Sequence, residues 1–253
     1  MAVTRIALFS DTHISHEETE RQSLFRVRLA GVVQSINGAK VDFALCGGDL
    51  MENALPEEAR AAFDLIQPLQ VPVRFVPGNH DIGNKPLPDN SYETKDEWLD
   101  GWEASVGPCF FMEQIAGVRV IGLTGSLFGS SLPRNEVQWM FLEREATRPQ
   151  SGPTVLLVHY PPFLARSDEP GDYWNISSPD RERLLDLASM AGVSVALSGH
   201  THRPIVNHHR DILLLTTPPV SFNLTGAPRQ LGWTLLILHP DGKVETEFRW
   251  MED

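Results

Sequence analysis

The sequence predicts an α/β protein in which two β-sheets pack face to face with helices on the outside. In the first half of the chain, short apolar runs alternate with segments of helical length, which indicates βαβ units and a mostly parallel sheet. In the last third, apolar runs follow one another with turns between them, which indicates antiparallel strands of a second sheet. The chain has 253 residues, 42% of them hydrophobic, which is enough to bury the core of a single domain.

The elements of the first half follow from the length and the ending of each apolar run. The expected strands are short, rich in Val, Ile, Leu and Phe, and end at Gly or a turn. The second helix begins at Pro56, which suits a first helical turn because proline lacks the backbone donor that this turn leaves unpaired. Strand and helix alternate, beginning with a strand, over residues 4–9, 18–36, 41–46, 56–67 and 72–76.

Residues 81–110 interrupt this alternation. The stretch begins polar and rich in Pro and Asn, and it then carries Trp98 and Trp102 in an expected short helix. A long excursion directly after a loop with Asn, His and Asp commonly forms a lid or a wall of a substrate site. We therefore expect one domain over residues 1–253, with a lid-like insertion near 81–110.

The second half resumes the alternation and then changes to strands alone. A polar loop is expected over 164–177, and Pro240-Asp241-Gly242 is expected to form the turn of a terminal hairpin. The expected strands are 117–124, 154–160, 193–199, 212–217, 232–239 and 243–250, and the expected helices are 135–147 and about 179–190.

Side chains that can bind metal stand where the apolar runs stop. They are Asp11, His13, Asp49, Asn79, His80, Asp81, His159, His200 and His202. Because α/β sheets bind ligands at the carboxyl ends of their strands, strands lying side by side would bring these groups into one crevice. In an extended segment, residues i and i+2 face the same way, so the Asp-x-His pair can reach one cation, and the His-x-His pair can serve one metal or two adjacent ones.

This set of donors predicts a pair of metal ions. Asp49 is the natural bridge, since one carboxylate has two oxygens and can join cations about 3.5–4 Å apart. The donors are nitrogen and oxygen with no thiolate, which suits Mn²⁺, iron as Fe²⁺ or Fe³⁺, or Zn²⁺. Two divalent ions outweigh the negative charge of Asp11, Asp49 and a bridging hydroxide. The pocket would therefore attract an anionic substrate, and phosphate esters fit.

The bulk composition excludes several classes of protein. The formal net charge of -12 argues against a protein built to hold nucleic acid, which would present a basic face. Cys46 and Cys109 lie far apart without a CxxC spacing, so we expect two reduced thiols rather than a disulfide scaffold. No signal-peptide pattern and no apolar run of about 18 residues is present. We therefore expect a soluble cytoplasmic protein with no membrane partner.

Five short blocks, DTH, GGDL, PGNHD, VHYPP and GHTH, occur in this order and resemble the signatures of the calcineurin-like metallophosphoesterases. The resemblance covers residues 5 to about 202, and the following ILLLTTPPVSFN is similar to the family's usual continuation. It implies a four-layer α/β/β/α sandwich of two mixed sheets flanked by helices, with the metal site at the C-terminal ends of strands. It assigns the first metal to Asp11, His13, Asp49 and His202, and the second to Asp49, Asn79, His159 and His200.

The resemblance also implies a reaction. Two metals lower the pKa of a shared water, and the resulting bridging hydroxide attacks phosphorus while Asn79 helps to neutralise the phosphoryl oxygens. His80 would donate a proton or a hydrogen bond to the leaving oxygen, with Asp81 holding its ring. No protein nucleophile is needed, so no covalent intermediate is expected.

Two departures from related patterns bear on the substrate. Purple acid phosphatases have a tyrosine three residues after the bridging aspartate, where this chain has Glu52, so the iron–phenolate site should be missing. VHYPP resembles the HHPP block of bacterial cyclic-nucleotide and glycerophosphodiester phosphodiesterases, with Tyr160 replacing the second histidine. We expect hydrolysis of a small phosphodiester, with a phosphomonoesterase or a protein phosphatase as the alternative. A nuclease and a non-catalytic interaction scaffold are further alternatives, and the sequence leaves the oligomeric state open, a dimer included.

Other residues keep two interpretations. Arg203 would touch a phosphate or pair with a surface carboxylate, and His16 would face the pocket or be a solvated loop histidine. Aromatic side chains would stack on a nucleoside base or anchor loops in the core. These are Trp98, Trp102, Tyr173 and Trp174. Surface positions are expected for His208, His209 and the acidic run from Asp168 to Asp172, and a structural role is expected for His239.

Overall fold

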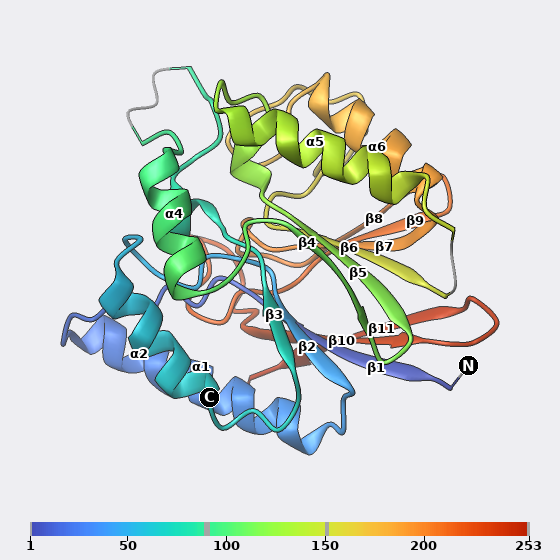
Figure 1. Cartoon of the computed structure of the whole chain (residues 1–253). Helices are drawn as coiled ribbons and strands as arrows, with labels where there is room; N and C mark the ends of the chain where they lie inside the picture. Colours follow the sequence, from blue (N-terminus) through green and yellow to red (C-terminus); the bar gives the residue numbers. More distant parts are fainter. Residues whose placement is uncertain (1, 89–91, 150–151, 252–253) are drawn as a thin grey trace.

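The computed structural model describes residues 2–88, 92–149 and 152–251. Two β-sheets lie face to face, and helices cover the outer face of each sheet (Figure 1). One sheet packs against α1 (Glu20–Gly38) and α2 (Pro56–Ile66), and the other against α5 (Pro133–Ala146) and α6 (Asp180–Met190). The expected sandwich of two mixed sheets between helices is confirmed.

The first sheet has the strand order β11-β10-β1-β2-β3. Its strands β1 (Thr4–Phe9), β2 (Phe43–Cys46) and β3 (Val73–Phe75) run parallel and are connected by α1 and α2. The terminal hairpin of β10 (Gly232–Leu238) and β11 (Val244–Trp250) continues this sheet, because β10 pairs antiparallel with β1. The prediction that the hairpin belongs to the second sheet is wrong. Nearly every residue of β10 is buried, so this strand needs a partner on each side, and β1 supplies one.

The second sheet has the strand order β4-β5-β6-β7-β9-β8. Its parallel centre consists of β5 (Val118–Leu123), β6 (Thr154–Val158), β7 (Val193–Ser198) and β9 (Ile212–Thr216). The edge strands β4 (Phe111–Ile115) and β8 (Ile205–His209) run antiparallel to their neighbours and have no counterpart in the sequence prediction. Both are short and only partly buried, so neither carries the apolar run by which the other strands are recognised.

The layers are held together by three apolar clusters. The cluster between the two sheets includes Ile6, Leu8, Phe43, Leu45, Val120, Val155, Leu157, Leu197 and Leu236. The other two clusters lie between each sheet and its helices. At the carboxyl ends of the central strands, the two sheets are joined by His159, whose Nδ1 donates to the Gly47 carbonyl at 2.7 Å. The predicted crevice therefore lies where two sheets meet, rather than along the edge of one.

The insertion near 81–110 contains the end of α3 (Asn79–Ile82) and all of α4 (Asp96–Ser105), while residues 89–91 lie outside the described chain. Trp102 is buried in the core, and the ring of Trp98 lies 4.7 Å from that of Tyr92. These two tryptophans therefore anchor the insertion. Its action as a lid stays a prediction, as does the single-domain boundary.

Two simpler expectations concern thiols and membranes. Cys46 and Cys109 are both buried and free, as expected. Among the helices of the described ranges, none combines the length and the apolar character that crossing a bilayer requires.

The one 3₁₀ turn of the described residues, η1 (Gly125–Leu127), follows β5 directly.

Replacing Leu157 by Ala should lower the free energy of unfolding by about 2–5 kcal/mol, because this fully buried side chain fills the space between the sheets. Val27 on α1 is 69% exposed, so Val27→Ala is the matched control and should change this free energy by no more than about 0.5 kcal/mol. Urea unfolding followed by circular dichroism measures both values. Equal effects of the two substitutions would contradict the packing between the sheets.

Candidate metal centre

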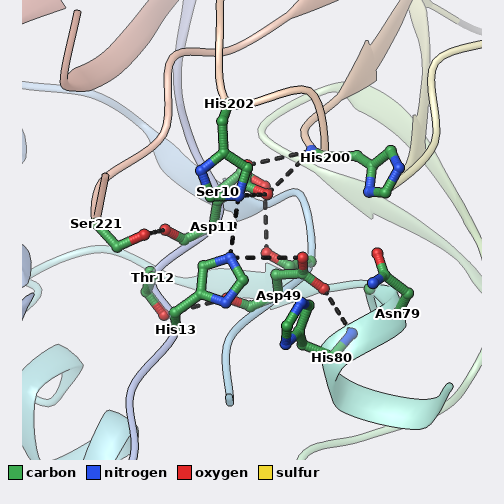
Figure 2. A network of polar contacts seen from close by, with 12 residues as sticks. Ser10, Asp11, Thr12, His13, Asp49, Asn79, His80, His200, His202 and Ser221 are labelled. Atoms are coloured by element: carbon green, nitrogen blue, oxygen red, sulfur yellow. Dashed lines mark hydrogen bonds and ion pairs between the residues drawn. The ribbon is translucent and has the colours of Figure 1, made fainter. Parts of the chain in front are cut away.

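Seven predicted metal ligands converge where the two sheets meet, and Figure 2 shows most of them pointing toward one another. Those that follow strands of the first sheet are Asp11, His13, Asp49 and Asn79, and those that follow strands of the second sheet are His159, His200 and His202. All seven are buried. Their donor atoms therefore sit in a low-dielectric environment that separates them from bulk water.

Five of these seven residues have left-handed backbone conformations, which are uncommon outside glycine. The φ angles are 56° at Asp11, 48° at His13, 50° at Asp49, 72° at His200 and 51° at His202. Such conformations cost on the order of 1 kcal/mol each, and they persist only where surrounding contacts hold them. The expectation of extended Asp-x-His and His-x-His segments is therefore wrong, because turns rather than strand alternation orient the side chains of each pair.

Glycines make room for these turns. A Cβ atom at Gly78 would overlap Asp49 Oδ1, and one at Gly48 would lie 2.5 Å from His159 Nδ1. Gly48 also has a φ of 98°, a conformation that other residues rarely adopt. The glycines of the GGDL and PGNHD blocks thus let the backbone approach the carboxylate and imidazole of the site.

The first cluster consists of Asp11, His13, Asp49 and His202, whose donor atoms all lie within 4.8 Å of one another. His13 Nε2 is 3.6 Å from Asp49 Oδ2, and His202 Nε2 is 3.6 Å from Asp11 Oδ1. The two Nε2 atoms are 3.1 Å apart. This cluster contains the four residues that the family resemblance implies for the first metal.

The second cluster shares Asp49 with the first and adds His159 and His200. His159 Nε2 lies 3.3 Å from Asp49 Oδ2 and 3.2 Å from Asn79 Oδ1. Asp49 Oδ2 therefore lies between an imidazole of each cluster, as a bridging carboxylate requires.

Each histidine of the two clusters has one ring nitrogen bonded to an acceptor outside them. His13 Nδ1 donates to Glu52 Oε2, His159 Nδ1 to the Gly47 carbonyl, His200 Nε2 to the Tyr173 carbonyl and His202 Nδ1 to the Phe222 carbonyl. A carbonyl oxygen can only accept, so the nitrogen facing it carries the proton. The other nitrogen of each neutral ring then presents its lone pair to the site.

When both rings are neutral, two such lone pairs face each other in the first cluster, on His13 Nε2 and His202 Nε2. The carboxylates of Asp11 and Asp49 beside them are acceptors as well. Buried acceptors without a donor or a cation between them are unfavourable. The residues present therefore fit a metal ion with nitrogen and oxygen ligands.

The pKa values of the histidines also indicate that the site favours positive charge. Burial opposes protonation of His159, but the Asp49 carboxylate outweighs it and raises the pKa of His159 to about 9. Burial also opposes protonation of His13, but the hydrogen bond to Glu52 and the charge of Asp49 raise the pKa of His13. Burial and the neighbouring His159 hold the pKa of His200 well below its usual value, which keeps this ring neutral.

His80 and Asp81 do not form the contact that the sequence predicts. His80 is only partly buried; its backbone N–H donates to Asp49 Oδ1 at 2.9 Å, and its Nδ1 donates to the Glu52 carbonyl at 2.9 Å. Asp81 instead accepts the backbone N–H groups of Leu50, Met51 and Gly78. The prediction that Asp81 holds the ring of His80 is wrong, because the short turn of α3 directs this carboxylate onto the GGDL loop.

Three groups of the site were not identified as such from the sequence. Glu52, noted there only as a departure from a tyrosine, accepts the proton of His13 Nδ1 at 3.0 Å. Tyr173 and Phe222 contribute backbone carbonyls, at 2.9 Å from His200 Nε2 and 2.7 Å from His202 Nδ1. A residue's side chain does not reveal what its carbonyl accepts, so no sequence signal marks these two positions.

The remaining polar candidates differ in their exposure. His16 and Arg203 are exposed, and so is His208 on β8, whereas His209 is half-buried. Tyr160 is fully buried, with its ring 4.3 Å from that of His200, so it supports this imidazole from the protein side.

The affinity for Mn²⁺ should rise as the pH rises toward about 9, because protons on His13 and His159 must leave before these rings bind metal. The pKa values of both rings are raised. At a pH below these values, the metal must displace a proton from each ring, and each such proton lowers the apparent affinity by up to about tenfold for every unit that the pH falls. Calorimetric titration of Mn²⁺ in buffers of different ionisation enthalpy measures both the affinity and the protons released. An affinity that does not change between about pH 6 and 8 would contradict this linkage.

Replacing Gly78 by Ala should weaken metal binding by about 10- to 100-fold, since the new methyl group would displace the Asp49 carboxylate. A Cβ at Gly101 meets no heavy atom within 4 Å, so Gly101→Ala is the matched control and should bind metal as the wild type does. Equilibrium dialysis against Mn²⁺ with elemental analysis compares the variants. Wild-type affinity in Gly78→Ala would show that the position of Asp49 does not govern binding.

Comparison with known proteins places this geometry in a family. The sequence model described as Calcineurin-like phosphoesterase matches residues 4–204. A relative from Danio rerio named Serine/threonine-protein phosphatase CPPED1 is 31% identical over 160 residues, which cover 61% of this chain and about half (49%) of that protein. A probable cyclic nucleotide phosphodiesterase from Synechococcus is 24% identical over 252 residues, which cover 98% of this chain and 92% of the relative.

Another relative and a solved structure are similar to this chain as well. A probable glycerophosphodiester phosphodiesterase from Arcobacter nitrofigilis is 28% identical over 215 residues, which cover 82% of this chain and 75% of the relative. The solved structure of a dimetal phosphatase from Danio rerio shares the fold with a TM-score of 0.62 at 13% identity, over 99% of this chain and 97% of that one. The family model covers well over half of the chain, and both ligand clusters lie within the matched residues. The chain therefore belongs to the calcineurin-like phosphoesterase family and is a hydrolase of phosphate esters.

Proposed function

We propose that this protein hydrolyses a small phosphodiester at a centre of two metal ions. The observation that carries the proposal is the pair of buried ligand clusters that share Asp49. Two divalent cations held there supply Lewis acidity and a bound water of lowered pKa. Mn²⁺, iron and Zn²⁺ all suit this donor set, and cellular supply decides between them.

The chain's own residues orient the substrate and assist the leaving group. His80 has its Nδ1 bonded to the Glu52 carbonyl, so its Nε2 is the ring atom available to a ligand. The ring is partly exposed and lies with its centroid 4.5 Å from that of His13, beside the first cluster. In the proposed reaction, His80 acts as an imidazolium whose Nδ1 keeps its bond to the Glu52 carbonyl while Nε2 donates a proton or hydrogen bond to the departing oxygen.

The proposal needs no nucleophile from the protein. Cys46 is fully buried, and burial raises the pKa of its thiol well above the usual value, so it is not available as a thiolate. Its free state and that of Cys109 suit a reducing compartment, and we propose a cytoplasmic location. Hydrolysis then proceeds by direct attack of water on phosphorus.

The choice of a small diester rests on which relatives match along their whole length. The Synechococcus phosphodiesterase matches over 98% of this chain and 92% of its own, whereas the CPPED1 relatives match over 61–85% of this chain and 49–70% of their own. Tyr173 and Trp174 also stand beside His200, with rings 4.8 and 5.5 Å from it. These side chains narrow one side of the centre, which suits a small ester.

A phosphatase acting on phosphoproteins is the second candidate, because CPPED1 from Danio rerio is 31% identical to this chain over 160 residues, against 24% and 28% for the two phosphodiesterases. A nuclease is disfavoured by the net charge of -12, since polyanion binding requires a basic face. A non-catalytic scaffold would have no use for the complete set of donors or for His80.

The diester preference is tested with two chromogenic esters. With Mn²⁺ present, kcat/KM for bis(p-nitrophenyl) phosphate should exceed that for p-nitrophenyl phosphate by about tenfold or more, because the centre is expected to be built around a singly charged ester. Continuous measurement of p-nitrophenol release gives both values. A higher kcat/KM for the monoester would favour the phosphatase candidate instead, and a phosphopeptide assay would then follow.

Replacing His80 by Ala should reduce kcat by about 10²- to 10⁴-fold for diesters with a poor leaving group, such as an alkyl alcohol. The loss should be smaller for p-nitrophenol, which leaves without help from an acid. His208 is exposed on β8, so His208→Ala is the matched histidine control. The same loss with both leaving groups would argue against proton donation by His80.

A further inference from the structure

The polar loop over 164–177 is braced from within rather than solvated along its length. Glu169 accepts the backbone N–H groups of Leu164, Ala165 and Arg166 at 2.6, 3.0 and 3.0 Å, and its Oε1 also accepts from Asn175 Nδ2 at 2.6 Å. Asp168, which is paired with Arg166, and Asp172 are exposed as expected of surface groups, whereas Glu169 is half-buried. Glu169 thus has a structural role that the sequence did not suggest.

Two buried cations fasten the same loop to the body of the protein. Arg181 at the start of α6 is fully buried and donates to the carbonyls of Ser167, Glu169 and Ile176. Lys85, which is also buried, donates from Nζ to the Asp172 carbonyl at 2.6 Å. The loop is therefore held on both sides of Tyr173.

Tyr173 uses this fixed position to contact two residues of the second cluster. Its carbonyl accepts from His200 Nε2 at 2.9 Å, which places the proton on Nε2 and leaves Nδ1 as the donor atom. Its hydroxyl accepts from Asn79 Nδ2 at 3.3 Å, which turns Asn79 Oδ1 toward His159. One residue thereby sets the orientation of an imidazole and an amide that belong to the same proposed cation.

We infer that Tyr173 is a positioning residue for the second metal, and that the braced loop over 164–177 governs how tightly this metal is held. The hydroxyl of Tyr173 acts through Asn79 and its carbonyl acts through His200, so both groups of Tyr173 orient proposed metal ligands. Residues that orient metal ligands in this way commonly change affinity by about 10- to 100-fold. The inference rests on the proposed dinuclear centre. It adds that Tyr173 and its loop set the affinity of one of the two metal sites.

Tyr173→Phe tests the hydroxyl arm, because it keeps the ring and the carbonyl and removes only the acceptor of Asn79. Calorimetric titration of Mn²⁺ into the metal-free protein should show one of two sites weakened by about tenfold and the other unchanged. Trp174→Phe is the matched control, since Trp174 lines the same side of the site without either hydrogen bond to a ligand. Its two affinities should equal those of the wild type.

Activity measured against Mn²⁺ concentration separates positioning of metal from contact with substrate. If Tyr173 acts through the metal, kcat and KM of Tyr173→Phe return to wild-type values at saturating Mn²⁺. A raised KM that persists at saturating Mn²⁺ would mean that the hydroxyl contacts the substrate, and it would overturn the inference.

A second pair of variants tests the brace without touching Tyr173. Glu169→Gln weakens the acceptor of three backbone N–H groups and should weaken the same Mn²⁺ site, whereas the exposed Asp168→Asn should not. Wild-type Mn²⁺ binding by both Tyr173→Phe and Glu169→Gln would disprove the inference and leave the proposed function standing. If the wild-type protein binds neither Mn²⁺ nor Zn²⁺, the proposed function itself is disproved, and this inference is disproved with it.

Discussion

The structure depends on a group of buried acceptors that only positive charge can hold together. The carboxylates of Asp11 and Asp49 and the site-facing ring nitrogens of four imidazoles lie within a few ångströms of one another, buried in the protein. Burying such groups without compensation is costly, because nothing replaces the lost solvent. Strained turns at five of the ligands add to this cost. The two sheets and their apolar clusters supply the stability against which this site is built.

The orientation of the imidazoles comes from the backbone of distant segments. The carbonyls of Gly47, Tyr173 and Phe222 each fix one histidine ring, and the Glu52 carboxylate fixes a fourth. A carbonyl does not titrate, so the tautomers it selects persist over a wide pH range. The segments that carry these carbonyls therefore have a defined role, which is to present an oxygen to one histidine ring.

Much of the fold follows from the sequence because its central strands are continuous apolar runs ended by glycine or a turn. The order of the strands does not follow from the sequence. The sheet edge that a hairpin joins depends on which faces become buried when the sheets assemble, as the pairing of β10 with β1 shows. The ligands could be named because their side chains carry the chemistry. The partner of His80 could not, because the acceptor is the carbonyl of Glu52, and a carbonyl is present at every residue.

The recognisable signature and the physical unit differ in length. The five blocks end by 202 and the family model ends at 204, yet the segment after β9 completes the centre. Val220 and Ser221 donate their backbone N–H groups to the carbonyls of Ser10 and Asp11, and β10 then closes the open edge of β1. A fragment cut at the last signature residue would carry every ligand and still lack the scaffold that aims them. Engineers who transplant or truncate such domains should set the boundary by this returning strand.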